Sequence, residues 1–477
     1  MPPSQSPVLA PAPCTFAIFL GNRGFFPSSC IAGARDDLLQ ALARHGHRGI
    51  CPGEDGMRHG AVETAAEGRA WARWFAEHRA EVDGVILCLP NFGDENGAVA
   101  AMQDCGVPIL IQAYPDELER MGPAERRDAF CGKMSVLDVF RQVGIRCTAL
   151  KPHVVHPLSA DFQSNLVHFA ALCRVVRGMR RFSVGAIGAR TTAFKTVRVD
   201  EVALQQVGVT VEATDLSDLL ARVRSLGDDD ADVRAKQERL RGYSNFAKVP
   251  GKAFVTLSKL GVAIDRIAVE LSCDAIALRC WIELQQQLGV SPCVLLSELN
   301  DRGLPAACEV DIGNAVVMRA LRLATGGQTT LLDWNNNYGD DPDKVILFHC
   351  GPVPQGLMIG PGEVTDHVLL QGVLGEGCSY GCNTGRIRPF DFTYGGLVTD
   401  HGRVEVYLGE AAFTSDPVPK AFFGCAGVAR FPGLQDILLT IAKQGHRHHV
   451  ALASGLARDA LVEALGGYLG YHVTRFA

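Results

Sequence analysis

Short apolar runs alternate with amphipathic stretches through the first 150 residues of the chain. TFAIFLG (15–21), GVILCLP (84–90) and GVPILIQAYP (106–115) have the length and apolar continuity of buried strands. Between them lie stretches with helical periodicity, such as VETAAEGRAWARWFAEHRAEV (62–82). Because strands alternate with helices, we expect a parallel sheet with helices on both of its faces.

The same alternation begins again near residue 181. Helical segments separate apolar runs that we interpret as strands; these runs are RFSVGAIGAR (181–190), VTVEATD (209–215), DAIALRCW (274–281), AACEVD (306–311), TTLLDWNN (329–336) and KVILFHCGP (344–352). The pattern predicts a second doubly wound, parallel-sheet α/β domain.

The pattern changes after residue 350, where glycine becomes frequent and helical periodicity weakens. FTYGGLVTDHGRVEVYLGEA (392–411) predicts a β-hairpin that turns at Asp400-His401-Gly402. We therefore expect a β-rich, barrel-like C-terminal domain after the two α/β domains. The predicted boundaries are 1–175, 176–350 and 351–477.

Composition narrows the classes of function. The net charge of −6 and the lack of a Lys/Arg cluster with interleaved aromatics argue against nucleic-acid binding. No run approaches the roughly 20 apolar residues of a membrane span, and the N-terminus lacks the pattern of a secretory signal. Most of the 16 cysteines lie in apolar runs, which is typical of buried thiols in a reducing compartment. We expect a cytoplasmic protein with no membrane or nucleic-acid partner.

Polar side chains stand at the ends of three predicted strands in the second half of the chain. Glu309 ends AACEVD, Asp333 ends TTLLDWN and His349 ends KVILFHCG. Each of them alone could be a cap or a salt-bridge partner. Ligands of open α/β sheets gather at the carboxyl ends of strands, and two carboxylates with an imidazole suit a divalent ion such as Mn²⁺ or Mg²⁺. The three together predict a metal site.

A histidine cluster near the C-terminus offers a further ligand. KQGHRHHVALASG (443–455) contains His446, His448 and His449 just before an apolar run. Three histidines in four positions favour at least one metal ligand, although surface histidines also occur in clusters. The residues alone do not choose among the three.

Several of these motifs resemble the L-fucose and L-arabinose isomerase family. The resemblance rests on GARTTAFKTVRVDE (188–201), CEVD at Glu309, LLDWNN at Asp333, FHCGP at His349, the hairpin at 392–411 and GHRHHVALASG. It implies three-domain subunits in a homo-oligomer, with a hexamer favoured. It also implies a metal site between the second and third domains, with His449 as the third ligand by register. The expected ion is Mn²⁺, with Mg²⁺ or Co²⁺ as alternatives.

The resemblance implies that the chain is an isomerase, an intramolecular oxidoreductase that acts on a free sugar. Asp333 resembles the fucose branch and the FHCGP histidine the arabinose branch, so L-fucose, L-arabinose and sulfoquinovose all stay candidates. Our candidate substrate contacts are His349, Trp334, Asn335, Arg23 and Asn91; His349 could instead be a fourth metal ligand or a hydrogen-bond partner of the ligands. The resemblance implies that Asn91 faces the substrate of a neighbouring subunit. Trp334 could equally belong to the core, and Arg23 could equally form a helix-cap salt bridge.

Sugar isomerisation requires removal of a proton from the carbon beside a carbonyl. A divalent ion neutralises charge that develops on the two sugar oxygens, and adjacent carboxylates move the proton. We therefore expect Glu309 and Asp333 to be both metal ligands and the acid/base pair. The alternatives are a metal-dependent sugar-acid lyase or aldolase, and a non-catalytic sugar-binding protein on the same scaffold.

Overall fold

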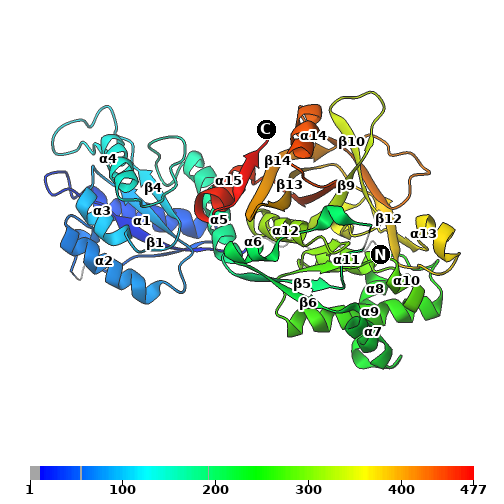
Figure 1. The fold of residues 1–477 in the computed structure, drawn as a ribbon. Helices are drawn as coiled ribbons and strands as arrows, with labels where there is room; N and C mark the ends of the chain where they lie inside the picture. The colour runs from blue at the N-terminus through cyan, green and yellow to red at the C-terminus, as the bar shows by residue number, and fades with distance from the viewer. Residues whose placement is uncertain (1–10, 54–55, 192) are drawn as a thin grey trace. The chain divides into compact units, whose positions relative to one another are not determined.

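The computed structural model describes residues 11–53, 56–191 and 193–477, which form two compact units. The first unit comprises Ala12–Arg177, and the second comprises Gly178–Ala477 together with Pro11. Figure 1 shows the course of the chain through both units.

The first unit is a four-stranded parallel sheet in the order β2-β1-β3-β4. All six residues of β3 are buried, as expected for a central strand covered on both faces. The strands are β1 (Thr15–Leu20), β2 (Arg48–Ile50), β3 (Gly84–Leu89) and β4 (Ile109–Ala113). The helices are α1 (Cys30–Arg44), α2 (Ala65–His78), α3 (Glu95–Met102), α4 (Ala129–Gln142) and α5 (Ala160–Met179).

The second unit begins with another four-stranded parallel sheet, in the order β6-β5-β7-β8. Its strands are β5 (Phe182–Ile187), β6 (Val209–Thr214), β7 (Ala275–Leu278) and β8 (Ala306–Cys308). Its helices are α6 (Glu201–Gln206), α7 (Leu216–Ser225), α8 (Ala231–Tyr243), α9 (Gly251–Glu270), α10 (Glu283–Leu288), α11 (Cys293–Asp301) and α12 (Ile312–Thr325).

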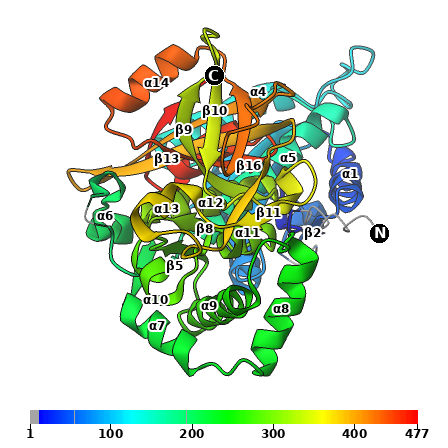
Figure 2. The same ribbon diagram turned by 90° about the vertical axis from the view of Figure 1, so that its right-hand side faces the viewer.

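A nine-stranded, mainly antiparallel sheet completes the second unit (Figure 2). Because β15 pairs with both β10 and β14, the central strands close into a barrel. The strands are β9 (Thr329–Asn337), β10 (Lys344–His349), β11 (Glu363–Thr365), β12 (Cys382–Arg386), β13 (Phe390–Asp400), β14 (Arg403–Phe413), β15 (Cys425–Arg430), β16 (His449–Ser454) and β17 (His472–Arg475). The helices are α13 (Val368–Leu374), α14 (Leu434–Lys443) and α15 (Arg458–Val462).

The predicted hairpin is present as β13 and β14. Asp400 pairs with Arg403, so the loop consists of His401 and Gly402, whose φ angles are 45° and 74°. Two positive φ angles are typical of the type I′ turn that suits the twist of a hairpin. The turn chemistry of the sequence therefore fixes the hairpin register.

The structure corrects our assignment of β9 and β10 to the second parallel sheet. β9 pairs antiparallel with both β10 and β16, so both strands belong to the barrel. A short apolar run predicts a strand but does not identify its pairing partner. The predicted fold class, two parallel-sheet α/β domains followed by a β-barrel, is confirmed. None of the helices in the described ranges has the length and apolar character needed to cross a bilayer.

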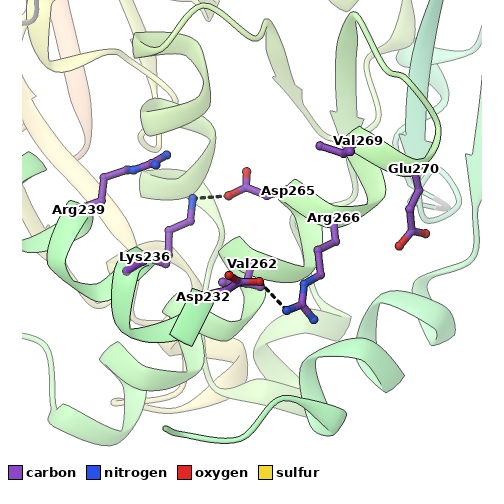
Figure 3. Close-up of a pocket in the computed structure, with 9 residues that line it drawn as sticks. Asp232, Lys236, Arg239, Val262, Asp265, Arg266, Val269 and Glu270 are labelled. Carbon is purple, nitrogen blue, oxygen red and sulfur yellow. Dashed lines mark hydrogen bonds and ion pairs between the residues drawn. The ribbon is translucent and has the colours of Figure 1, made fainter. Parts of the chain in front are cut away.

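A cavity of about 390 Å³ lies between α8 and α9 (Figure 3). Lys236, whose side chain is 4% exposed, is 2.7 Å from an Asp265 oxygen and 3.2 Å from a Glu298 oxygen. Arg266 at the rim pairs with Asp232. These charges are matched in pairs, so we interpret the cavity wall as a structural charge network.

Replacement of Lys236 by Met should lower the free energy of unfolding by about 3 kcal/mol, because it removes a buried partner of Glu298. Thermal and urea denaturation of the full chain measure this effect. Lys248→Met is the matched control, since Lys248 forms an exposed ion pair with Glu363 that should contribute at most about 1 kcal/mol. Equal losses in the two variants would contradict the structural role of Lys236.

Candidate active site

Two carboxylates and a histidine from distant parts of the sequence meet in the second unit. Glu309 directly follows β8, Asp333 lies within β9 and His449 begins β16. The register places His449 directly opposite Asp333 across the β9–β16 pair. Nε2 of His449 is 3.1 Å from Oε2 of Glu309 and 3.4 Å from Oδ1 of Asp333. The structure therefore brings both carboxylates next to His449, and ligand atoms lie within 4.8 Å of one another in two sets, Glu309 with His349 and His449, and Asp333 with His448 and His449.

The backbone turns sharply where it presents Glu309. Glu309 and Val310 have φ angles of 62° and 56°, in the left-handed region that non-glycine residues seldom adopt. Such residues cost on the order of 1–3 kcal/mol each and gather at functional sites. The strained turn joins the end of β8 to the start of α12 and directs the Glu309 carboxylate toward His449.

Asp311 anchors this cluster from the start of α12. Its carboxylate accepts the Asn314 backbone N–H at 3.0 Å as the helix N-cap, accepts Nδ1–H of His449 at 2.8 Å and pairs with buried Arg447. Burial opposes ionisation of Asp311, but Arg447 and His449 outweigh it and hold its pKa well below the usual range. Asp311 is therefore a fixed anion behind His449.

The Asp311 hydrogen bond determines which nitrogen of His449 faces the two carboxylates. Since Asp311 accepts the proton on Nδ1, the neutral ring directs the Nε2 lone pair toward Glu309 and Asp333. Oε2 of Glu309 and Oδ1 of Asp333 accept no hydrogen bond from the described residues. Three lone pairs that face one another repel unless a cation or a proton lies among them.

Without a cation, protonation of His449 relieves this repulsion. Burial lowers the pKa of His449, but its hydrogen bond to Asp311 and its close contact with the Glu309 carboxylate dominate and raise it to about 10. Burial raises the pKa of Asp333 above its ordinary value. Burial also opposes ionisation of Glu309, but its contact with His449 and the charge of His349 lower its pKa. The protein environment thus favours the protonated form of Asp333 and the ionised form of Glu309.

His349 presents its opposite nitrogen to the same region. The Cys350 backbone N–H donates to Nδ1 of His349 at 2.9 Å, so in the neutral ring the hydrogen is on Nε2. This Nε2 is buried and has no hydrogen-bond partner among the described residues. Ligand atoms of Glu309, His349 and His449 all lie within 4.8 Å of one another. His349 is therefore placed to donate a hydrogen bond into the site.

A cavity of about 140 Å³ opens beside these groups. Its lining comprises Cys280, Trp281, Gln285, Ser291, Cys293, Glu309, Asp333, Phe348, His349, Cys350, His367, Leu369 and Leu370. Nε1 of Trp281 donates to Oε1 of Glu309 at 3.0 Å, which orients this carboxylate. Oε1 of Gln285 and Nδ1 of His367 are buried without a partner in the described part of the chain. Such free polar atoms are available to a polar ligand.

Comparison with known proteins identifies the family. Residues 17–180 match the N-terminal domain of fucose/sulfoquinovose isomerases, and residues 347–477 match the C-terminal domain of L-fucose isomerases. The chain belongs to the L-fucose isomerase family. It is accordingly a sugar aldose–ketose isomerase, an intramolecular oxidoreductase, as the sequence analysis predicts.

Curated relatives of the isomerase agree with this assignment. Sulfoquinovose isomerases of Priestia aryabhattai and Priestia megaterium are each 24% identical to the chain over 397 residues, which is 80% of the chain and 83% of the relative. A sulfoquinovose isomerase of Alkalicoccus urumqiensis is 22% identical over 382 residues, 78% of the chain and 81% of the relative.

Trp334 is not brought together with the metal-site candidates of the isomerase. Its ring packs on Phe431 and Tyr394, with centroids 4.8 and 5.9 Å away, and Nε1 donates to Tyr407 at 3.4 Å. The Trp334 side chain therefore lies in the barrel core, which is one of the two alternatives that the sequence left open. Its position does not support a sugar contact.

Asn335 is exposed and bonds to Asn336. The pairing of β9 with β10 runs from Trp334 to Asn336, so Asn335 is the extra residue of a β-bulge. It does not line the 140 Å³ cavity.

Arg23 and Asn91 belong to the first unit of the isomerase, where both hold loops together. The Arg23 guanidinium donates to the Gly93 carbonyl at 2.8 Å, pairs with Glu95 and lies over the Phe92 ring. Asn91 is buried, and its Oδ1 accepts the backbone N–H groups of Arg23 and Gly93. These contacts match the salt-bridge alternative for Arg23, and substrate contact by either residue stays a prediction.

Three polar residues of the site, Asp311, Trp281 and Gln285, were not predicted from the sequence. Asp311 stands two residues after Glu309 in the same motif, but we read it only as part of the strand end. Trp281 and Gln285 follow the strand run DAIALRC, where the side chains carried no recognisable metal or acid/base pattern. The position of Trp281 after a parallel strand was the available signal.

Proposed function

We propose that the isomerase binds Mn²⁺, or another divalent ion such as Mg²⁺ or Co²⁺, with Glu309, Asp333 and His449. The observation that carries this proposal is the convergence of the His449 Nε2 lone pair on two carboxylate oxygens at 3.1 and 3.4 Å. Neighbouring ligands of an octahedral ion with bonds of about 2.1 Å lie about 3 Å apart, which is close to the distance of His449 Nε2 from each of the two carboxylates.

The bound ion would supply Lewis-acid stabilisation of negative charge on the two sugar oxygens. In the proposed reaction, Glu309 and Asp333 move the proton between C1 and C2, and between the two oxygens, as the carbonyl changes place. His349 donates a hydrogen bond from Nε2 to a sugar oxygen, and Trp281 holds Glu309 in orientation. Asp311 keeps His449 in the ligand tautomer.

We propose sulfoquinovose as the first sugar to test, because the curated relatives are named as isomerases of that sugar. L-Fucose and L-arabinose stay candidates. The lining of the 140 Å³ cavity includes no Lys or Arg. A sulfonate would therefore need a cation from elsewhere, a role for which Arg23 remains our candidate.

We propose a first domain boundary at 175/176; because β9 and β10 pair within the barrel, the second boundary moves from 350/351 to the segment before β9. We also propose a homo-oligomer with a hexamer favoured, a cytoplasmic location and a substrate contact from Asn91 of a neighbouring copy. The family resemblance in the sequence supports the oligomer and the neighbour's contribution.

Glu309→Gln and Asp333→Asn should each lower kcat by at least about a thousandfold with Mn²⁺ present, because each removes a ligand and a proton carrier. A panel of sulfonated, deoxy and ordinary aldoses, assayed for conversion to ketoses, measures this. A chelator should abolish activity and Mn²⁺ restore it. Glu363→Gln, at an exposed ion pair, is the matched control. Near wild-type turnover in either site variant, or products with fewer carbons, would overturn the proposal.

Asp311→Asn should weaken Mn²⁺ binding by about 10–100-fold, because Asn still caps α12 but no longer fixes the charge and tautomer of His449. Titration of free Mn²⁺ by electron paramagnetic resonance measures the affinity, and circular dichroism checks folding. Asp215→Asn is the control, since Asp215 caps α7 on the surface without touching a histidine. Unchanged Mn²⁺ affinity in folded Asp311→Asn would contradict the role of Asp311.

His349→Leu should lower kcat by about a hundredfold while Mn²⁺ affinity changes little, because the lost group is a donor to substrate rather than a ligand. His349→Gln should recover part of the activity through its amide N–H. Steady-state kinetics and Mn²⁺ titration separate the two effects. Loss of Mn²⁺ as severe as that in His449→Gln would identify His349 as a ligand instead.

A further inference from the structure

Four cysteines lie together beside His349. We call Cys280, Cys293, Cys308 and Cys350 the thiol cluster. Cys308 ends β8, Cys293 begins α11, and Cys280 and Cys350 follow β7 and β10. The first three are at most 3% exposed, whereas Cys350 is half-buried. The cluster thus brings together the ends of three strands and one helix.

The thiols contact one another more closely than ordinary core packing requires. Sγ of Cys293 is 3.5 Å from Sγ of Cys350, which in turn lies within 4.8 Å of Sγ of Cys308. A buried cysteine usually behaves as a small hydrophobic side chain among apolar neighbours. Here the sulfur atoms of Cys293, Cys308 and Cys350 lie close to one another and next to the His349 imidazole.

The geometry of this series suits a thiophilic ion. Sγ of Cys350 is 3.3 Å from Nδ1 of His349, and ligand atoms of Cys308, His349 and Cys350 all lie within 4.8 Å of one another. Ligands of tetrahedral zinc, with bonds of about 2.0–2.3 Å, are separated by roughly 3.3–3.8 Å. Cys293 or Cys280 could complete the coordination, and both line the 140 Å³ cavity together with Cys350.

We propose that Cys308, Cys350 and Nδ1 of His349 form a second metal site for a soft divalent cation such as Zn²⁺, which inhibits the isomerase when occupied. On zinc binding, Nδ1 gives up the hydrogen bond that it accepts from the Cys350 backbone N–H. Thiolates favour Zn²⁺, whereas the carboxylate-rich site beyond His349 suits Mn²⁺ or Mg²⁺. The imidazole separates the two sites, because Nδ1 faces Cys350 and Nε2 is the free donor.

The position of the thiol cluster explains why bound zinc would inhibit the isomerase. Zinc held by Cys350 would occupy the cavity beside Glu309 and Asp333, where the sugar would bind, and would tie His349 down through Nδ1. The effect on activity rests on the proposed function, whereas zinc binding does not.

The first experiment adds Zn²⁺ to the full chain preloaded with Mn²⁺, without substrate, and records zinc X-ray absorption. We expect about one zinc per chain with a sulfur shell near 2.3 Å, and Mn²⁺ still bound. Glu309→Gln/Asp333→Asn should keep the sulfur shell, because the thiols are untouched. A shell of nitrogen and oxygen only, in the wild-type protein, would overturn the proposal without recourse to a cysteine variant.

The second experiment uses cysteine variants and activity. Cys308→Ser and Cys350→Ser should lose the sulfur-bound zinc, whereas Cys131→Ser, at an exposed thiol of α4, should keep it. Wild-type activity should fall in proportion to sulfur-bound zinc and return when a zinc chelator is followed by Mn²⁺. Full activity at full occupancy would refute inhibition. Lack of Mn²⁺-dependent activity before zinc is added would instead refute the proposed function.

Discussion

The buried carboxylate of Asp311 is the constraint on which the site depends. It caps α12, neutralises Arg447 and accepts the Nδ1 proton of His449. α12 packs against both the parallel strand β8 and the barrel strands β9, β13 and β16. The buried Asp311 carboxylate therefore links the two sheets of the second unit and sets the tautomer of His449 between them. Loss of Arg447 would leave Asp311 as an uncompensated buried charge.

Sheet register then positions the remaining groups. β9 lies between β10 and β16, so Asp333 has His449 opposite on one side and Phe348 on the other. His349 follows Phe348 and reaches the same region from the end of β10. Glu309 comes from the parallel sheet through its left-handed turn. Rigid strands hold groups more precisely than loops do, which suits chemistry that tolerates little displacement.

Local sequence signals predicted the elements and the principal polar groups, but not the partners. Glu309 and Asp333 were visible because a carboxylate interrupts the end of an apolar run. That β9 and β10 join the barrel was not visible, because pairing depends on β16, more than 100 residues later. The sequence around Trp334 did not show whether its side chain packs in the core or contacts the sugar. The donor role of His349 depends on a backbone N–H, which no side-chain pattern encodes.

Charge balance determines what such a site can hold. Arg447 offsets Asp311, so Glu309 and Asp333 carry the remaining negative charge, which one divalent cation neutralises. In the proposed reaction, the neutral part of a sugar would then enter without further charge compensation, and negative charge that develops on it would be stabilised by the cation and by the His349 N–H. The neighbouring thiols add no negative charge while they are protonated. A soft cation changes that balance by drawing thiolates into ligation, which is why the two adjacent sites, although they share one imidazole, respond to different metals.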